Sequence, residues 1–191
     1  MRLAHKYARI ERERRFLVEQ FPAPANVVGI RSIKDLYIDN TALRLREQTE
    51  DTGAVVFKLT QKIPARGPGA QQGFITNMYL SKEEFRVLAQ LSGKKLRKTR
   101  YSLPPFGIDV FEGELAGLLL AEAEFDSADA ADSLTLPSFL RAEVSADDRF
   151  TGGRLARASR LEIQNWLTEY GIRFSSSELA DRLLPVRGIR E

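Results

Sequence analysis

Short runs in which apolar residues alternate with fully charged ones recur along this sequence, and they restrict its fold more than any other feature. Strict alternation predicts β-strands, because successive side chains on a strand point to opposite faces of the sheet. The pattern occurs over residues 7–18, 36–47, 54–63, 74–80, 96–103, 106–112, 117–126 and 141–145. We therefore expect a mainly β protein of antiparallel strands, since such strands can carry one apolar and one polar face.

Two helices are predicted among these strands and two after them. Ser81 and Ser127 each stand where a helix N-cap is expected, and Ser81 with Glu84 matches the capping-box pattern. Residues 154–170 form an amphipathic pattern that predicts one helix, and a capping-like start at Ser175 predicts another in the tail. The Gly- and Pro-rich residues 64–73 predict a hairpin loop.

The composition excludes several kinds of catalytic site. The sequence has no cysteine and one histidine, His5, which excludes disulfides, Cys-based zinc sites, thiol nucleophiles and Ser-His-Asp triads. A metal would be held by carboxylates, which favours Mg²⁺ or Mn²⁺. No apolar run approaches the roughly 18 residues of a membrane span, and we see no signal peptide. We expect a cytoplasmic protein without a membrane partner.

The charged residues of each strand share one face. On a single strand this indicates a solvated outer surface, but five such strands together favour a closed barrel with a charged, hydrated interior. Buried charges without ligands would be costly, whereas basic side chains bind phosphate oxygens and carboxylates hold a hard cation. The sequence therefore predicts a metal–polyphosphate site inside a barrel. The shared faces are those of Glu11, Glu13 and Arg15; Arg44 and Arg46; Lys58 and Lys62; Lys98 and Arg100; and Glu122 and Glu124.

Motifs over about residues 7–156 resemble those of CYTH domains, the triphosphate tunnel metalloenzymes. Residues 11–15, Glu-Arg-Glu-Arg-Arg, resemble the ExExK signature that opens these domains. The segments that follow in the order of the family are 37–39 with 43–46, 58–62, 98–101, 108–111, 120–125 and 143–150. One such motif is weak evidence, whereas the ordered series is strong evidence for the fold.

The resemblance implies an eight-stranded antiparallel β-barrel tunnel over residues 1–156 with peripheral helices. A helical extension over 157–191 would pack on or near the barrel, where a homodimer contact is one option. The implied activity is metal-dependent hydrolysis of the terminal phosphoanhydride of a small triphosphate. Inorganic triphosphate is the leading substrate, and ATP and thiamine triphosphate are the others considered.

The resemblance also implies roles for individual residues. The metal, Mg²⁺ or Mn²⁺, would be held by Glu11, Glu13, Glu122 and Glu124, with Asp109 and Glu143 at further acidic positions. Catalytic roles would fall to Arg15, Glu11 and Glu13. The substrate would be bound by Arg44, Arg46, Lys62, Lys98, Arg100, Arg149 and Lys58.

Three positions depart from the pattern of the family. Arg15 stands where the signature has lysine, and an arginine stays protonated and cannot act as a base. Asn77 or Ile75 stands where many hydrolytic members have a glutamate, which would weaken metal binding. Phe150 replaces a tyrosine. These departures put catalytic competence in question.

Three other functions stay open from the sequence. An adenylate cyclase of the same fold would need an adenine pocket, which we cannot locate in the sequence. A binding module for polyphosphate or nucleotides, without turnover, would fit Arg15 and Asn77. Nucleic-acid binding is suggested by five basic residues within 94–100, but alternation directs Lys98 and Arg100 into the barrel and the net charge is only +3.

Overall fold

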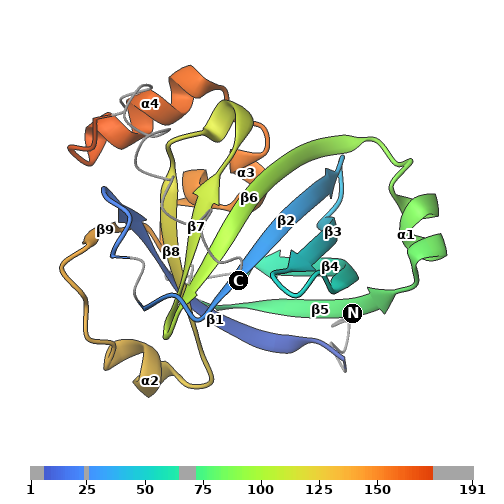
Figure 1. Ribbon diagram of the computed structural model, residues 1–191, viewed down its shortest axis with the longest axis horizontal. Helices are drawn as coiled ribbons and strands as arrows, with labels where there is room; N and C mark the ends of the chain where they lie inside the picture. The colour runs from blue at the N-terminus through green and yellow to red at the C-terminus, as the bar shows by residue number, and fades with distance from the viewer. Residues whose placement is uncertain (1–6, 24–25, 65–71, 174–191) are drawn as a thin grey trace, which may run out of the picture.

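The structure is a computed structural model that describes residues 7–23, 26–64 and 72–173. Most of it is antiparallel sheet, and eight strands close into a barrel (Figure 1). Around the ring the strands follow the order β1, β5, β4, β3, β2, β6, β7 and β8, and β8 pairs with β1 to complete it. The eight-stranded antiparallel barrel predicted from the sequence is therefore confirmed.

The strands of the ring are 6 to 11 residues long. A ninth, shorter strand pairs with β1 outside the ring. The bounds are β1 (Arg9–Val18), β2 (Gly29–Ile38), β3 (Leu43–Glu50), β4 (Val55–Pro64), β5 (Gln72–Leu80), β6 (Gly93–Leu103), β7 (Phe106–Phe111), β8 (Leu119–Phe125) and β9 (Leu140–Glu143).

The helices are short and lie around the barrel. No helix in the described part of the chain is long and apolar enough to cross a membrane. α1 lies at one side beside the ends of β5 and β6, and α4 lies over the ends of β7 and β8 (Figure 1). The bounds are α1 (Lys82–Leu88), η2 (Gly113–Leu115), α2 (Ala128–Asp132), η3 (Asp148–Phe150), α3 (Gly152–Leu155) and α4 (Arg160–Glu169).

The predicted strand at 36–47 was wrong. The structure divides it between β2 and β3, which a turn joins at Asn40, where φ is 57°. The sequence pattern missed most of β2, because both of its faces mix apolar and polar side chains: Ile33 shares one face with Asp35, and Lys34 shares the other with Leu36. The predicted strand at 141–145 corresponds to β9, outside the ring.

The helix starts at Ser81 and Ser127 are confirmed, but the single helix predicted over 154–170 was wrong. Two helices, α3 and α4, occupy this segment. Ser159 separates them because its side chain accepts from the Glu162 N–H while the Glu162 carboxylate accepts from the Ser159 N–H at 2.8 Å, which starts a new helix. Residues 65–71 of the predicted hairpin loop and the helix start at Ser175 lie outside the described residues.

The inner face of the barrel changes from charged to apolar toward one end. Leu17, Leu96 and Leu120 each lie two residues from Arg15, Lys98 and Glu122 on the same strand faces, toward the same end of the barrel. These leucines pack in one buried cluster with side chains of the C-terminal segment, which fill this end of the barrel. The contributing side chains are Val144, Phe150, Leu155, Ile163, Leu167 and Ile172.

The outer face of β1, β7 and β8 is also apolar and covered. Phe16, Ile108 and Ala121 are buried there, and Phe21 and Phe139 pack against the same cluster. The two faces of these strands therefore differ in role. The outer face packs in an apolar cluster that stabilises the fold, and the inner face carries the charged groups beyond its apolar end.

Candidate active site

Three carboxylates meet inside the barrel where β1 and β8 pair. Glu13 lies directly opposite Glu124, and Glu11 is two residues along the same face of β1. Each offers an oxygen within 4.8 Å of the others, which makes the trio a candidate cation site. All donors are carboxylate oxygens, the ligand type that hard divalent cations prefer, so the residues fit Mg²⁺ or Mn²⁺.

Lys62 forms ion pairs with two of these carboxylates. Its Nζ is 2.8 Å from Glu11 and 3.6 Å from Glu13. Burial by itself lowers the pKa of Lys62, but the two glutamates more than offset this and raise it. Burial raises the pKa of Glu11 despite Lys62. The ammonium group therefore balances the carboxylate charge at the position where a cation would bind.

Glu122 joins two arginines. It forms ion pairs with Arg100 and with Arg15, whose Nε lies 3.2 Å from the carboxylate. Burial alone would raise the pKa of Glu122, but Lys98, Arg100 and Arg15 hold it well below its ordinary value. The sequence predicted Glu122 as a metal ligand, but the carboxylate trio does not include it, and its contacts are with basic groups.

Asp109 serves the basic groups of β6 in the same way. It is fully buried on β7 and accepts two hydrogen bonds from Arg100, at 2.6 and 2.7 Å. It also forms an ion pair with Lys98. Both side chains come from the adjacent strand because Arg100 is directly opposite Asp109 in the β6–β7 register. Asp109 thus fixes two predicted substrate ligands, and both of its oxygens are occupied.

Asp35 is a member of the site that the sequence reasoning missed. Arg46 donates to both of its oxygens at 2.7 Å, and Asp35 is only 3% exposed. Burial alone would raise the pKa of Asp35, but Arg44 and Arg46 lower it. One sequence feature could have revealed Asp35: it shares a strand face with Ile33 and Tyr37, and a buried aspartate is rare unless it is paired.

Arg44 and Lys58 have less compensation than the other basic groups. Arg44 donates to the Thr60 hydroxyl at 3.3 Å, but its buried Nε has no hydrogen-bond partner and lies 3.9 Å from Asp35. Lys58 makes no hydrogen bond or ion pair within the described ranges, and burial together with Arg46 and Arg44 lowers its pKa. These two groups leave positive charge for an anion to neutralise.

Asn77 extends the contacts of Arg44. Its Oδ1 accepts from the Thr60 hydroxyl at 2.8 Å, and Thr60 in turn accepts from Arg44. A glutamate here would bring a negative charge toward this group, whereas the amide is neutral. The departure from the family pattern therefore leaves the Arg44 side of the interior more positive.

Arg15 is held rigidly in the interior. Its guanidinium forms ion pairs with Glu13 and Glu122, and its backbone N–H donates to the Ser145 hydroxyl at 2.9 Å. Burial by itself lowers the pKa of Arg15, but the two glutamates raise it above its ordinary value. The group is a permanent cation that contacts Glu13 of the carboxylate trio and shares Glu122 with Arg100.

Two predicted site residues lie elsewhere. Glu143 is on β9 and pairs with Arg14 at 2.6 Å, and Arg14 points to the face of β1 opposite Glu13 and Arg15. Arg149 lies in η3, where it pairs with Asp147 and Glu169, both at 2.8 Å. Their sequence positions matched the family motif, but the strand outside the ring and the C-terminal segment keep them away from the charged interior.

The basic run over residues 94–100 divides between two environments. Lys98 is buried in the interior and Arg100 is partly buried there, whereas Lys94, Lys95 and Arg97 are exposed. Alternation along β6 places Lys95 and Arg97 on the outer face, whereas Lys94 shares the face of Lys98 and is exposed because it lies near the start of the strand. The run therefore does not form one continuous surface patch.

Comparison with known proteins places these features in a family. No family model matches the chain. The inorganic triphosphatase of Nitrosomonas europaea is 34% identical over 154 residues, which are 76% of this chain and 96% of that protein. The crystal structure of the inorganic triphosphatase NE1496 matches with a TM-score of 0.51 and 29% identity, over 78% of this chain and 95% of that one. A crystal structure of the hypothetical protein NE1496 matches with the same TM-score and 30% identity, over 78% and 99%. The chain therefore belongs to the same family as the Nitrosomonas europaea inorganic triphosphatase, which confirms the resemblance to the triphosphate tunnel enzymes.

Proposed function

We propose that this protein is a metal-dependent triphosphatase that hydrolyses the terminal phosphoanhydride of inorganic triphosphate in the cytoplasm. The observation that carries the proposal is that a trio of carboxylates and the basic side chains of β3, β4 and β6 share the interior of one barrel. A triphosphate and a divalent cation together complement both halves of this arrangement. The relatives that bear the name inorganic triphosphatase support the same reading.

Glu11, Glu13 and Glu124 would hold the cation. Mg²⁺ or Mn²⁺ bound there would neutralise charge on phosphate oxygens. Lys62 would then exchange its carboxylate contacts for phosphate oxygens, since the same carboxylates cannot satisfy both. Glu122 would act nearby by keeping Arg15 and Arg100 in place.

Arg44 and Lys58 would be the main ligands of the triphosphate. They carry the positive charge that the carboxylates of the site compensate least. Arg46, Lys98 and Arg100 would add a fixed positive field, because Asp35 and Asp109 hold them in place. Phosphoryl transfer depends mainly on such positioning and electrostatic stabilisation.

Arg15 would stabilise charge that develops during the reaction and would not transfer protons. Its raised pKa keeps it protonated. A water molecule in the polar network would attack the terminal phosphorus, the bridging P–O bond would break, and phosphate and diphosphate would leave. The proton of the water would pass to a phosphate oxygen or to solvent, and Arg15 would help to fix the network. Turnover would then depend on position and charge more than on a general base.

The interior favours an inorganic substrate. The apolar part of the inner face in the described chain is packed with the protein's own side chains, including Phe150 and Leu155. That end of the inner face therefore offers no free apolar surface to a nucleobase or thiazole ring. ATP and thiamine triphosphate are therefore the comparison substrates.

The test is phosphate release from the three triphosphates with Mg²⁺ or Mn²⁺. We expect metal-dependent turnover of tripolyphosphate that Glu124→Gln removes. Glu143→Gln is the matched control, because it makes the same chemical change outside the charged interior, and we expect it to retain activity. Loss of activity in the control alone would contradict the proposed site.

Two further measurements on the same samples separate the alternatives: cyclic AMP formation and the melting temperature with tripolyphosphate. Cyclic AMP formed from ATP would identify a cyclase. Stabilisation by tripolyphosphate without turnover of any substrate would identify a binding module, which the neutral Asn77 would help to explain.

A further inference from the structure

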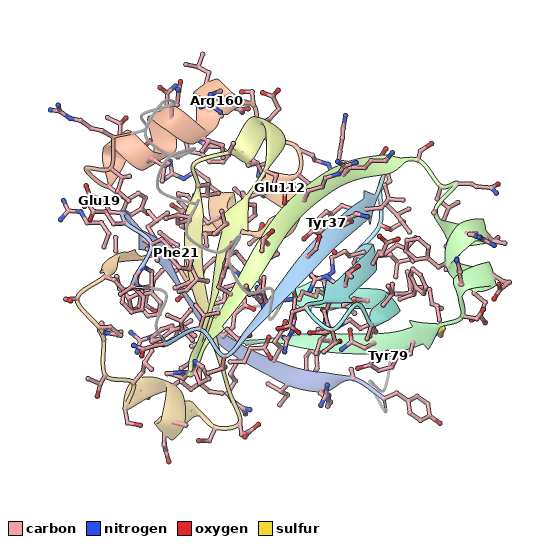
Figure 2. All side chains as sticks on the ribbon, viewed as in Figure 1. Glu19, Phe21, Tyr37, Tyr79, Glu112 and Arg160 are labelled. Atoms are coloured by element: carbon pink, nitrogen blue, oxygen red, sulfur yellow. The ribbon has the colours of Figure 1, made fainter. Side chains whose placement is uncertain are left out.

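The side chain of Arg100 crosses a whole strand to reach its second partner. Arg100 lies on β6, and Asp109, directly opposite on β7, accepts from it at 2.6 and 2.7 Å. The same guanidinium donates to Glu122 on β8, which is not a neighbour of β6. The intervening strand is β7, and Glu112 marks its end in Figure 2. Because neighbouring strands lie about 4.7–4.9 Å apart, Arg100 must extend across the inner face of β7.

Gly107 is the residue of β7 over which Arg100 passes. It lies directly opposite Glu122 in the β7–β8 register and shares its strand face with Asp109. A Cβ atom at Gly107 would lie 3.0 Å from Cδ of Arg100 and 3.3 Å from its Nε. Both distances are shorter than the roughly 3.5–4.0 Å of a favourable carbon contact. The missing side chain therefore leaves the space that Arg100 fills.

The backbone gives no reason for a glycine at this position. Gly107 is not among the residues with positive φ, so an alanine could adopt its conformation. It also lies inside a strand that pairs on both sides, where glycine is unfavourable because it has no side chain to pack and loses more freedom on folding. The passage of Arg100 explains why glycine stands here.

The contact between Arg100 and Glu122 connects two cations of the interior. Glu122 also pairs with Arg15, whose Nε lies 3.2 Å away. Burial by itself lowers the pKa of Arg100, but Asp109 and Glu122 raise it well above its ordinary value. A methyl group at Gly107 would force Arg100 to move. Two hydrogen bonds hold Arg100 to Asp109 and one holds it to Glu122, so the contact with Glu122 would be lost first.

We propose that Gly107 is a positioning residue for the reaction. Its missing side chain allows Arg100 to hold the Glu122 carboxylate, and Glu122 in turn holds Arg15 in place. This inference rests on the proposed function, because it takes Arg15 and Arg100 as groups that stabilise charge on the triphosphate. Gly107 acts through Arg100 and needs no contact with the substrate.

The experiment compares Gly107→Ala with Gly29→Ala, which adds the same methyl group to the inner face of β2. Ser102 lies directly opposite both glycines, and a Cβ atom at Gly29 would have its nearest neighbour, Asp51 Oδ2, at 4.0 Å. We expect Gly107→Ala to lower kcat/KM for tripolyphosphate roughly tenfold, because displaced charges stabilise the transition state less well. Gly29→Ala should match the wild type.

A double-mutant cycle distinguishes positioning from general damage to the fold. Gly107→Ala is made in the wild type and in Glu122→Gln, and kcat/KM is measured for all four proteins. In the Glu122→Gln background the added methyl group should cost little, because the ion pair through which it acts is already broken. An equal loss in both backgrounds, or a Gly107→Ala variant as active as Gly29→Ala, would overturn the inference and leave the triphosphatase proposal intact.

Failure of the proposed function has a separate signature. If the wild type hydrolyses no triphosphate, the triphosphatase proposal fails, and crystal structures of the two alanine variants decide the positioning role. Separation of Arg100 from Glu122 in Gly107→Ala alone would support it. An Arg100–Glu122 contact that is kept in Gly107→Ala, or lost equally in Gly29→Ala, would overturn it.

Discussion

At the scale of single residues, the site consists of charges that hold one another in place. Asp35 and Asp109 are buried carboxylates whose main contacts are basic side chains of neighbouring strands. Such pairs fix the basic groups before any ligand binds, and removing one partner leaves an uncompensated buried charge. The arrangement therefore serves stability and function together.

Replacing Asp35 tests this dependence. We expect Asp35→Asn to lower the free energy of unfolding by about 3–5 kcal/mol, because Arg46 is left buried without its counter-charge. Glu50→Gln breaks the more exposed pair with Arg31, whose atoms lie 3.0 Å apart, and should cost less than about 1 kcal/mol. Urea unfolding measures both, and equal losses would show that burial of the Asp35 pair is unimportant.

The pKa of Asp35 gives this prediction a pH dependence. The folded-state pKa is lowered, so the stabilisation is present above the pKa of the unfolded chain and is lost as pH falls through the folded value. Asp35→Asn should lack this part of the acid destabilisation. A variant that loses stability in acid as steeply as the wild type would contradict it.

Lys58 predicts an alkaline limit to substrate binding. Burial, Arg46 and Arg44 lower its pKa, so Lys58 loses its charge earlier than an ordinary lysine as pH rises. We expect KM for tripolyphosphate to rise in that range and Lys58→Arg to move the rise to higher pH. Burial also lowers the pKa of Lys98, so part of the rise should persist. An unchanged KM profile would show that Lys58 does not contact the substrate.

At the scale of elements, two helices with the same capping box have different importance. α1 starts with Ser81 and Glu84, and α4 starts with Ser159 and Glu162. α1 buries none of its side chains, whereas α4 buries Ile163 and Leu167 in the apolar end of the barrel. The same local signal therefore begins a peripheral helix in one case and a core helix in the other.

Removing each cap should show this difference. We expect Ser159→Ala to lower the free energy of unfolding by about 1 kcal/mol, the usual cost of a lost N-cap. Ser81→Ala should affect global unfolding less, because α1 can fray without opening a core. Chemical denaturation compares the two, and a larger loss for Ser81→Ala would contradict the assignment of α4 to the core.

At the scale of the whole molecule, the barrel interior is close to charge balance without ligands. Lys62 lies on Glu11, and Arg15 and Arg100 share Glu122. A triphosphate alone would compete with these carboxylates, and a cation alone would compete with Lys62. Each ligand removes the competitor of the other, so their binding should be coupled.

Calorimetry tests this coupling. We expect Mg²⁺ to tighten the binding of tripolyphosphate by about 5–150-fold, the usual range for linked sites, after correction for complex formation in solution. Lys62→Gln should bind Mg²⁺ alone more tightly and show weaker coupling, because the competing ammonium group is gone. Equal Mg²⁺ affinity in the variant and the wild type would rule out competition by Lys62.

Much of the site was predictable because it depends on strand alternation. The shared faces of Glu11 with Glu13 and of Lys98 with Arg100 follow from a two-residue period, and both faces line the interior. Glu143 and Arg149 were misplaced because motif order does not show whether a segment joins the ring. Asp35 was missed because β2 mixes apolar and polar residues on both faces.

The sequence by itself determined the charged faces of the strands and the helix starts at Ser81 and Ser127, because these depend on local periodicity and capping. The charged faces together with the ordered family motifs predicted the barrel. Only the tertiary structure decided which charges meet and which end of the barrel is filled. Those outcomes depend on pairings between strands far apart in the sequence, such as Arg15 with Glu122, and on the packing of Gly152 against Tyr37. Contacts of this kind join residues that are far apart in the sequence, and no local pattern encodes them.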